Sequence, residues 1–244
     1  MLLLVASCGG ASAPGHDGGP SDAASDAGSV AAGLSVGLAG AWSFDTDGAD
    51  HAGHKLDLDV TGIKLVPGRF GEGLQFMGEG SKIAQRPIDD PSLDVATGDF
   101  TVSVWVSFAA TSTAQFIVIK GYDNGGWFVG WAQTAWAYGL GVPATAMGAT
   151  FADLDVTPPS GFHHVVLERT GASIEMFVDG QSIGTKAVTD SATPTAAPLQ
   201  VGGFSPGGVG AAQKVVTGVV DDLAIWHRAL TADERAYLGA HAVP

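Results

Sequence analysis

Residues 217–238 (TGVVDDLAIWHRALTADERAYL) join a strand pattern directly to a helix pattern. The first half is rich in β-branched and aromatic residues, which is typical of a strand. In the second half Glu234 follows Thr231 at the spacing of a capping box, so we expect a short helix there. Asp221 and Asp222 stand together within the apolar run. Because successive strand side chains point to opposite faces, at least one carboxylate must face the interior or a loop end, where it needs a partner.

The most regular alternation lies over residues 100–108 (FTVSVWVSF), where apolar residues occupy every second position. This period predicts a strand with one face against a second sheet. Trp105 falls on the opposite face, where we expect it to be exposed or covered by a loop. Asp179-Gly180, between two further strand patterns, predicts a tight hairpin. Together with 36 glycines and 45% hydrophobic residues in a chain of 244, these patterns predict an all-β sandwich with many tight turns.

Four stretches resemble laminin-G-like, concanavalin A-like jelly-roll domains. They are residues 40–45 (GAWSFD), 67–76 (PGRFGEGLQF), 162–169 (FHHVVLER) and 217–238. Members of this family end in a strand with paired acids, an aromatic residue, an Arg-Ala-Leu triplet and a short helix. Phe162 stands where the family usually has tryptophan. The resemblance implies an all-β, two-sheet antiparallel jelly-roll sandwich with a short C-terminal helix over residues 34–244, in which the first and last strands pair.

The N-terminal segment has a different composition. Residues 1–8 end in Val-Ala-Ser-Cys, which resembles a bacterial lipobox, so we predict a lipoprotein signal and lipidation of Cys8. The alternative is a chance cysteine in a disordered tail. Residues 9–33 are small, polar or acidic and cannot bury much apolar area, which predicts a disordered linker. This interpretation anchors the domain to a membrane through the lipid on Cys8 and places it at the bacterial cell envelope.

The net charge of −14 argues against nucleic acid as a partner, because phosphate binding needs a basic surface. We also expect no catalysis: glucanases on the resembled fold use a Glu-x-Asp-x-Glu strand, and no such string occurs here. Glu168 and Glu175, on adjacent expected strands, are interpreted as part of a solvated sheet face. His163 and His164 point to opposite faces of a strand and cannot share a zinc ion, so we expect one of them to form a core hydrogen bond.

Calcium is the expected cofactor, since it takes about six to eight oxygen ligands from carboxylates and carbonyls. Asp45, Asp47 and Asp50 lie in one loop. Asp221 and Asp222 would lie beside that loop if the first and last strands are neighbours. The resemblance implies that pairing, and it implies a structural calcium between these segments. The alternative is that the three loop aspartates form Asx-turns at the surface.

Tyr122, Trp131, Trp136 and Tyr138 lie in one aromatic segment and are the candidate ligand-binding residues, because sugar rings stack on exposed aromatic faces. The alternative is burial in the core. Trp127 shares a strand face with Trp131, which argues against exposure of the whole set, and we expect Trp127 in the core. For Trp131 and Trp136 both alternatives stay open.

The sequence therefore predicts a lipid-anchored, extracytoplasmic and non-catalytic binding module that recognises a carbohydrate or a protein at the cell envelope. One alternative is a structural or adhesive surface protein without a sugar ligand. Another is a divergent glycoside hydrolase, which the missing carboxylate motif disfavours.

Overall fold

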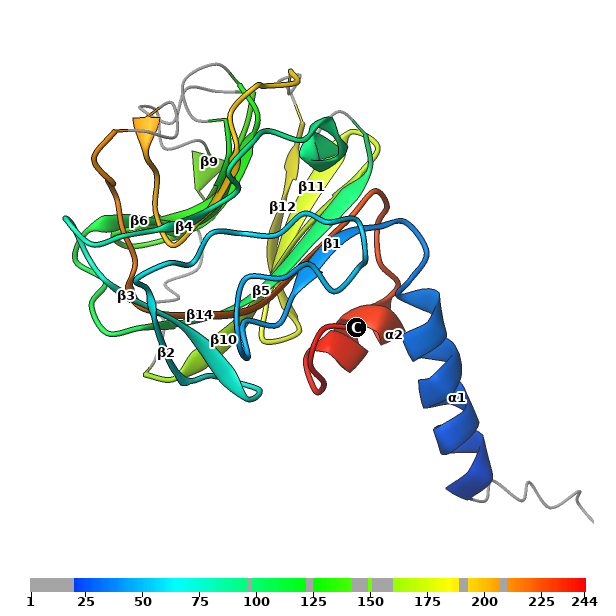
Figure 1. Ribbon diagram of the computed structural model, residues 1–244. Coiled ribbons are helices and arrows are strands. Elements are labelled where there is room, and N and C mark those ends of the chain that lie inside the picture. Colours follow the sequence, from blue (N-terminus) through cyan, green and yellow to red (C-terminus); the bar gives the residue numbers. More distant parts are fainter. Residues whose placement is uncertain are drawn as a thin grey trace, which may run out of the picture.

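The computed structural model describes residues 20–95, 98–121, 125–141, 149–150, 160–188, 193–206 and 210–244. Cys8 and Tyr122 lie outside these ranges, and so do residues 9–19 of the expected linker. Figure 1 shows two β-sheets that face each other, with the helices α1 and α2 together on one side. The predicted all-β, two-sheet antiparallel jelly-roll sandwich with a short C-terminal helix is confirmed.

The larger sheet has eight described strands, in the order β12-β11-β10-β5-β14-β3-β2, with β1 also pairing with β14. Their bounds are β1 (Leu38–Trp42), β2 (Lys64–Pro67), β3 (Glu72–Met77), β5 (Phe100–Phe108), β10 (Phe162–Thr170), β11 (Ser173–Val178), β12 (Gln181–Ala187) and β14 (Thr217–Trp226). The predicted pairing of the first and last strands is confirmed, because β1 runs antiparallel to the second half of β14. The first half of β14 pairs with β3, and β5 lies along its other edge.

The smaller sheet has six described strands, in the order β4-β13-β6-β7-β8-β9. They are β4 (Ala84–Gln85), β6 (Ala114–Lys120), β7 (Trp127–Ala132), β8 (Trp136–Leu140), β9 (Ala149–Thr150) and β13 (Leu199–Val201), and a short 3-10 turn, η1 (Pro91–Leu93), precedes β5. The Asp179-Gly180 hairpin is confirmed between β11 and β12, with φ of 51° and 77° at its two residues. Such positive φ values match the twist of two-residue hairpins.

The core lies between the two sheets. The alternation over β5 is confirmed: Phe100, Val102 and Val104 are fully buried and pack with apolar side chains of the smaller sheet. Trp105 points to the opposite face, as expected, and is covered there. The ring of Phe70 meets it edge-on, at 5.8 Å between centroids, and the guanidinium of Arg69 lies 4.7 Å above it. A loop therefore covers Trp105 and gives the larger sheet a second buried face.

The helix α2 (Ala232–Leu238) covers that outer face of the larger sheet. The predicted capping box is confirmed, because the Thr231 hydroxyl accepts the Glu234 N–H and the Glu234 carboxylate accepts the Thr231 N–H. Glu234 also pairs with Arg228 at 2.7 Å, which holds the helix against the end of β14. The indole N–H of Trp226 donates to the carbonyl of Leu34 at 2.7 Å. The N-terminal segment is thereby joined to the same layer.

The expected disordered linker is wrong over its second half, because residues Pro20–Gly33 form the helix α1. Alanine has the highest helix propensity, and proline is well placed at the first helical position. The C-terminal end of α1 is also held in place, since Arg228 donates to the carbonyl of Gly33 at 2.9 Å. The expectation of disorder, drawn from composition, left out both the helix propensity of alanine and this contact with Arg228. No helix in the described part of the chain is both long and apolar enough to cross a membrane.

Candidate functional site

The aromatic platform predicted from the sequence is wrong for its described members. Trp131, Trp136 and Tyr138 have exposed fractions of 0%, 1% and 6% and belong to the core between the sheets. The rings of Trp131 and Trp136 meet edge-on at 5.5 Å between centroids, and the Trp131 indole N–H donates to the Thr111 carbonyl at 2.9 Å. Trp127 is buried as predicted. No sugar can reach these faces in the folded protein.

The sequence held a signal for this burial. Trp127, Val129 and Trp131 alternate on β7, and Trp136, Tyr138 and Leu140 alternate in the same way on the neighbouring strand β8. All six side chains lie in the core cluster. When two paired strands carry large apolar groups at every second position, the shared face is the one against the other sheet.

The five candidate calcium ligands do not form one site. Asp50 accepts four backbone N–H groups, from Ala41 and Ala52 on Oδ1 and from His54 and Leu56 on Oδ2. It organises its own loop, and its oxygens are occupied. Asp47 accepts the N–H of Ala49 at 2.9 Å, which is the Asx-turn alternative. The bonds of both carboxylates are to backbone N–H groups of their own loop and of β1.

Asp45, Asp221 and Asp222 do lie near one another, around the turn over residues 68–72. Asp45 accepts the Glu72 N–H at 2.9 Å, and Asp221 accepts the N–H groups of Arg69 and Phe70 at 2.7 and 3.1 Å. The glycine at position 71 makes room for this arrangement, because a Cβ there would overlap the Asp45 carboxylate. Asp45, from the early loop, and Asp221, from β14, therefore bind the same turn, and the predicted pairing of the first and last strands brings them together.

The acid pair on β14 sits in an irregular stretch of strand. The register with β5 shifts between Asp221 and Ala224, and Asp222 has a φ of 43°. In a regular strand the two neighbouring side chains would point to opposite faces. The bulge changes this, and both carboxylates are buried. Asp222 Oδ1 accepts the Val243 N–H at 3.3 Å, whereas Oδ2 is buried with no hydrogen-bond partner among the described residues.

Burial makes ionisation of this pair unfavourable. Desolvation raises the pKa of Asp221 to about 6, and Asp45 adds to the rise. Desolvation raises the pKa of Asp222 to about 8, followed by the repulsion from Asp221 and, more weakly, from Asp45. A bound cation would offset the repulsion between these carboxylates, and Asp222 Oδ2, which has no hydrogen-bond partner among the described residues, is the kind of oxygen that calcium takes as a ligand. Across the described residues, however, no three histidine, cysteine, aspartate or glutamate side chains are arranged to hold a metal ion. Backbone carbonyls would have to supply much of any coordination.

The strand histidines and glutamates have structural roles. His164 forms the expected core hydrogen bond, with Nε2 at 2.8 Å from the Ser103 hydroxyl, and its ring stacks on Trp105. Burial lowers the pKa of His164 to about 4, so its ring is neutral at pH 7. The solvated sheet face expected for Glu168 is wrong. Glu168 is buried beneath α2 and pairs with Arg235 at 3.0 Å, because the helix covers this part of the sheet.

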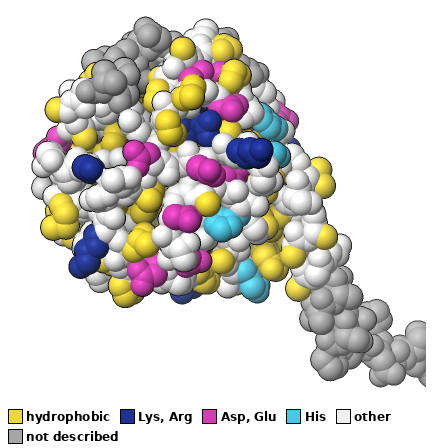
Figure 2. Space-filling view, in the orientation of Figure 1, with side chains coloured by type: hydrophobic (Ala, Val, Ile, Leu, Met, Phe, Trp, Pro, Cys, Tyr) yellow, Lys and Arg dark blue, Asp and Glu magenta, His cyan; other side chains and the backbone are white. Residues whose placement is uncertain are grey.

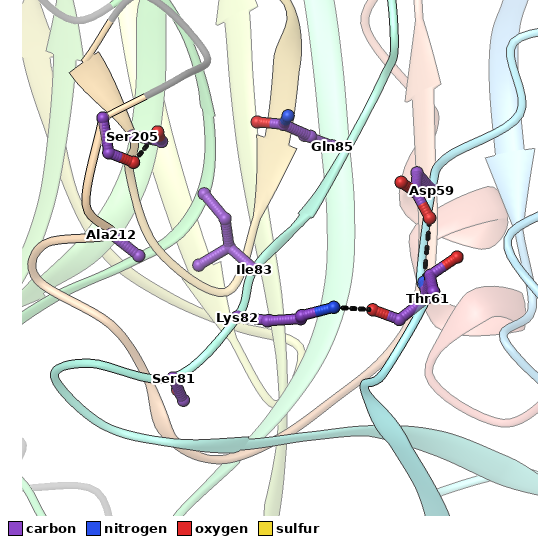
Figure 3. A pocket seen from close by; sticks show the side chains of 9 residues that line it. Asp59, Thr61, Ser81, Lys82, Ile83, Gln85, Ser205 and Ala212 are labelled. Atoms are coloured by element: carbon purple, nitrogen blue, oxygen red, sulfur yellow. Dashed lines mark hydrogen bonds between the residues drawn. The ribbon is translucent and has the colours of Figure 1, made fainter.

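A polar pocket lies at the edge of the smaller sheet, and no motif in the sequence predicts it. Its volume is about 320 Å³, at the small end of the range for ligand pockets. Three parts of the chain line it: residues 59–61, residues 81–85 with the edge strand β4, and Ser205 together with Gly210 and Ala212, as Figure 3 shows for the labelled side chains. The polar side chains that line it are Asp59, Thr61, Ser81, Lys82, Gln85 and Ser205, with Ile83 and Ala212 as apolar neighbours.

The pocket is assembled by backbone pairing. Asp59 and Gln85 form an antiparallel bridge, with the Asp59 N–H donating to the Gln85 carbonyl at 2.8 Å. Gln85 in turn pairs with Gln200 of β13, which leads into the third segment. Lys82 Nζ donates to the Thr61 carbonyl at 3.0 Å, and the Ser205 hydroxyl donates to the Gly210 carbonyl at 2.6 Å. These backbone and side-chain hydrogen bonds hold the lining segments together in the protein without a ligand.

Asp59 is an exposed carboxylate that stays ionised at neutral pH. Its Oδ1 accepts the Thr61 N–H at 2.9 Å. Hydrogen bonds from the Thr61 side chain and backbone lower the pKa of Asp59, and the charge of Lys82 lowers it further. The pocket thus combines a hydrogen-bond acceptor of full negative charge with a nearby cation, an amide and a hydroxyl. This donor and acceptor set suits a ligand rich in hydroxyl groups.

The family model described as "Concanavalin A-like lectin/glucanases superfamily" matches residues 82–234, well over half of the chain. The chain belongs to this laminin-G-like family. No curated protein matches it at the level of sequence. The matched range of the laminin-G-like chain includes the pocket residues from Lys82 onward and the acid pair on β14.

Several solved structures share the fold of this laminin-G-like chain at low sequence identity. Domain 4 of the arabinanase AbnA from Geobacillus stearothermophilus, solved with arabinotriose, has a TM-score of 0.64 at 17% identity, covering 83% of this chain and 98% of that one. Botulinum neurotoxin type C, whose cell entry depends on two ganglioside molecules, has a TM-score of 0.65 at 12% identity, covering 85% and 52%. The sialidase of Trypanosoma rangeli has a TM-score of 0.59 at 20% identity, covering 83% and 32%. The laminin-G-like chain thus spans about half of the neurotoxin chain and a third of the sialidase.

Proposed function

We propose that this protein is a non-catalytic carbohydrate-binding module whose ligand enters the pocket beside β4. The pocket is the observation that carries the proposal, since six polar side chains line a space of about 320 Å³ there, three of them exposed. Family membership supports it, as does the similarity to a domain solved with arabinotriose and to a toxin that depends on gangliosides. The buried tryptophans of the core take no part in this binding.

Binding would use the existing walls of the pocket. The Asp59 carboxylate accepts hydrogen bonds from sugar hydroxyls, and bonds to an ionised acceptor are stronger than neutral ones. The side chain of Gln85, which is paired with Asp59 in the bridge, and that of Ser205 line the same pocket and offer further polar groups, as Figure 3 shows. Ile83 offers an apolar surface for the C–H groups of a sugar ring. In Figure 1 β4 lies across the sandwich from α2, so a partner bound to the helices would leave the pocket accessible.

A glycan array with the wild-type protein and two variants tests the proposal. Asp59→Asn keeps the local turn but removes the charged acceptor, and it should weaken or abolish the signals. Asp233→Asn removes the same charge from the exposed first turn of α2, and it should leave the signals unchanged. A protein that binds no glycan, while melting cooperatively, would favour the alternative of a structural or adhesive surface protein.

We also propose that Cys8 is lipidated and that the module is displayed at the bacterial cell envelope. The support is the Val-Ala-Ser-Cys string of the sequence. Expression in a bacterial host with an alkyne fatty acid, followed by coupling to a fluorophore, should label the wild-type protein and leave Cys8→Ser unlabelled. Equal labelling of both proteins would exclude Cys8 as the lipid attachment site.

Calcium is a further proposal, with Asp222 and Asp45 as its carboxylate ligands. The bound ion would neutralise the buried acid pair and supply no reactive chemistry. A thermal melt should shift upward on addition of calcium and return in excess EDTA, because a ligand of the native state stabilises it. The Asp222→Asn variant should lose the shift, whereas Asp47→Asn should keep it. If the melting temperature of the wild-type protein is the same in calcium and in EDTA, the protein binds no stabilising calcium ion.

A further inference from the structure

We infer that the pocket beside β4 selects neutral sugars and disfavours acidic ones such as sialic acids. This inference rests on the proposed carbohydrate binding and concerns the charge of the ligand. The similar structures include a domain bound to a neutral sugar, arabinotriose, and toxins that bind gangliosides or a sialyl ligand. Domains of this fold therefore bind neutral as well as acidic glycans, and in this chain we expect the charged side chains of the pocket to determine which kind is bound.

The cation of the pocket is already engaged. Among the described residues that line it, Lys82 is the one with a positive charge. Its Nζ donates to the Thr61 carbonyl at 3.0 Å, as Figure 3 shows, and packs so closely on Gly62 that a Cβ there would lie 2.9 Å from it. The charge of Lys82 also acts on the neighbouring Asp59 carboxylate, so a sialic acid carboxylate that paired with the remaining N–H groups of Lys82 would compete with Asp59 for the same cation.

The remaining charge in the pocket is negative. Asp59 is exposed and ionised at neutral pH, and it faces the same small space that a ligand would fill. A ligand carboxylate placed there would lie well within the Debye length, about 8 Å at physiological salt, so the repulsion is poorly screened. The chain as a whole adds to this effect with a net charge of −14, and acidic side chains are spread over the face seen in Figure 2.

A neutral sugar meets none of these obstacles. Its hydroxyls donate to the Asp59 carboxylate, and its ring oxygens and hydroxyls accept from the remaining N–H groups of Lys82. The Ser205 hydroxyl already donates its proton to the Gly210 carbonyl, so it presents lone pairs to a ligand donor. The pocket is thus rich in acceptors, which matches a ligand with many O–H donors and no charge.

Titration calorimetry with matched glycans tests the inference. The array first identifies a neutral oligosaccharide that binds, and its α-2,3-sialylated derivative then serves as the paired probe. Wild-type protein should bind the neutral probe at least tenfold more tightly, and the ratio should fall as NaCl is raised. Asp59→Asn should reduce the ratio, and Asp59→Lys should reverse its direction. Asp233→Asn, with the same loss of charge away from the pocket, should keep the wild-type ratio.

The outcomes separate the two proposals. Equal or tighter binding of the sialylated probe by the wild-type protein overturns the inference and leaves carbohydrate binding in place. Binding of neither kind of glycan overturns both. A ratio that stays unchanged in Asp59→Asn also overturns the inference, because the discrimination would then come from another part of the molecule. A thermal melt of each variant confirms that the comparison is made on folded protein.

Discussion

The core of the sandwich and the pocket at its edge show that residue type and position carry different information. Trp131 and Trp136 have the side chains most associated with sugar binding, yet they are buried between two sheets. Asp59 and Lys82 are ordinary polar residues in loops, yet they are exposed and enclose a cavity. In this fold strands in the middle of a sheet are covered on the inner face, so groups for recognition come from sheet edges and loops.

The largest expected effect is on the core. Trp136→Ala should lower the free energy of unfolding by about 3–5 kcal/mol, because it leaves a large cavity in a packed interior. Trp136→Phe should cost less, since the indole N–H has no hydrogen-bond partner among the described residues. Chemical denaturation measures both. Loss of glycan binding in Trp136→Ala without loss of stability would mean that the aromatic platform exists after all.

A second effect is the response of the buried His164 to acid. Its pKa is lowered to about 4 by burial, so the unfolded chain takes up a proton near pH 6.5 while the folded chain resists. The free energy of unfolding should therefore fall as the pH drops from 6.5 to 4, by about 3 kcal/mol from this residue. The contribution of neutral, buried His164 to the free energy of unfolding is fully present above pH 6.5.

The control for this effect is His164→Gln, which should be less sensitive to acid than the wild type. Asp221 and Asp222 act in the opposite sense, because their raised pKa values of about 6 and about 8 favour the folded state at low pH. Their contribution is lost as the pH rises from about 4 to about 8. The difference between wild type and His164→Gln isolates the histidine. Parallel pH curves for the two proteins would contradict the prediction.

A third effect concerns the outer layer. Glu234→Ala removes half of the capping box and the partner of Arg228, and it should lower the free energy of unfolding by about 1–2 kcal/mol. Glycan binding at the pocket should be unchanged, because α2 lies across the sandwich from β4 (Figure 1). Thermal melts and calorimetry on the same sample check both halves. A loss of affinity with the fold intact would show that the helix layer takes part in binding.

The smallest effect on stability is expected at the pocket itself. Asp59 is exposed, and Asn retains its acceptor for the Thr61 N–H, so Asp59→Asn should change the free energy of unfolding by less than about 0.5 kcal/mol. Affinity for a neutral glycan should nevertheless fall about tenfold, because the charged acceptor is lost. A variant that binds as tightly as the wild type would exclude Asp59 as a contact.

The fold was largely predictable from the sequence because its signals are local. The alternation over Phe100–Phe108, the Asp179-Gly180 turn and the Thr231–Glu234 box each depend on residues that are close in the chain, and each is confirmed. Burial of at least one of Asp221 and Asp222 was predictable from two adjacent acids in an apolar strand. The bulge that hides both of them did not, since it depends on how β14 pairs with β5.

The site was less predictable because it depends on contacts between distant residues. Asp59 and Ser205 line one cavity only because β4 bridges their segments through Gln85. No motif or residue spacing in the sequence predicts that Gln85 pairs with both Asp59 and Gln200. The burial of Glu168 and the helix over Pro20–Gly33 were missed for a related reason, as both involve the outer layer around Arg228 and Arg235. Composition describes a segment in isolation and omits the layer that packs on it.

The pairing of β1 with β14 also sets how the domain responds to mechanical load. Leu38 lies opposite Trp226 in an antiparallel ladder, so the two ends of the sandwich emerge at the same end of that ladder. Tension between residues 34 and 230 would open the ladder one hydrogen bond at a time, as a zipper opens. Four bonds stand ahead of the first rung: Trp226 donates to Leu34, Arg228 donates to Gly33 and Val36, and the His227 N–H donates to the Gly37 carbonyl. We therefore expect the Trp226 and Arg228 side chains to bear part of such a load before the β1–β14 ladder opens.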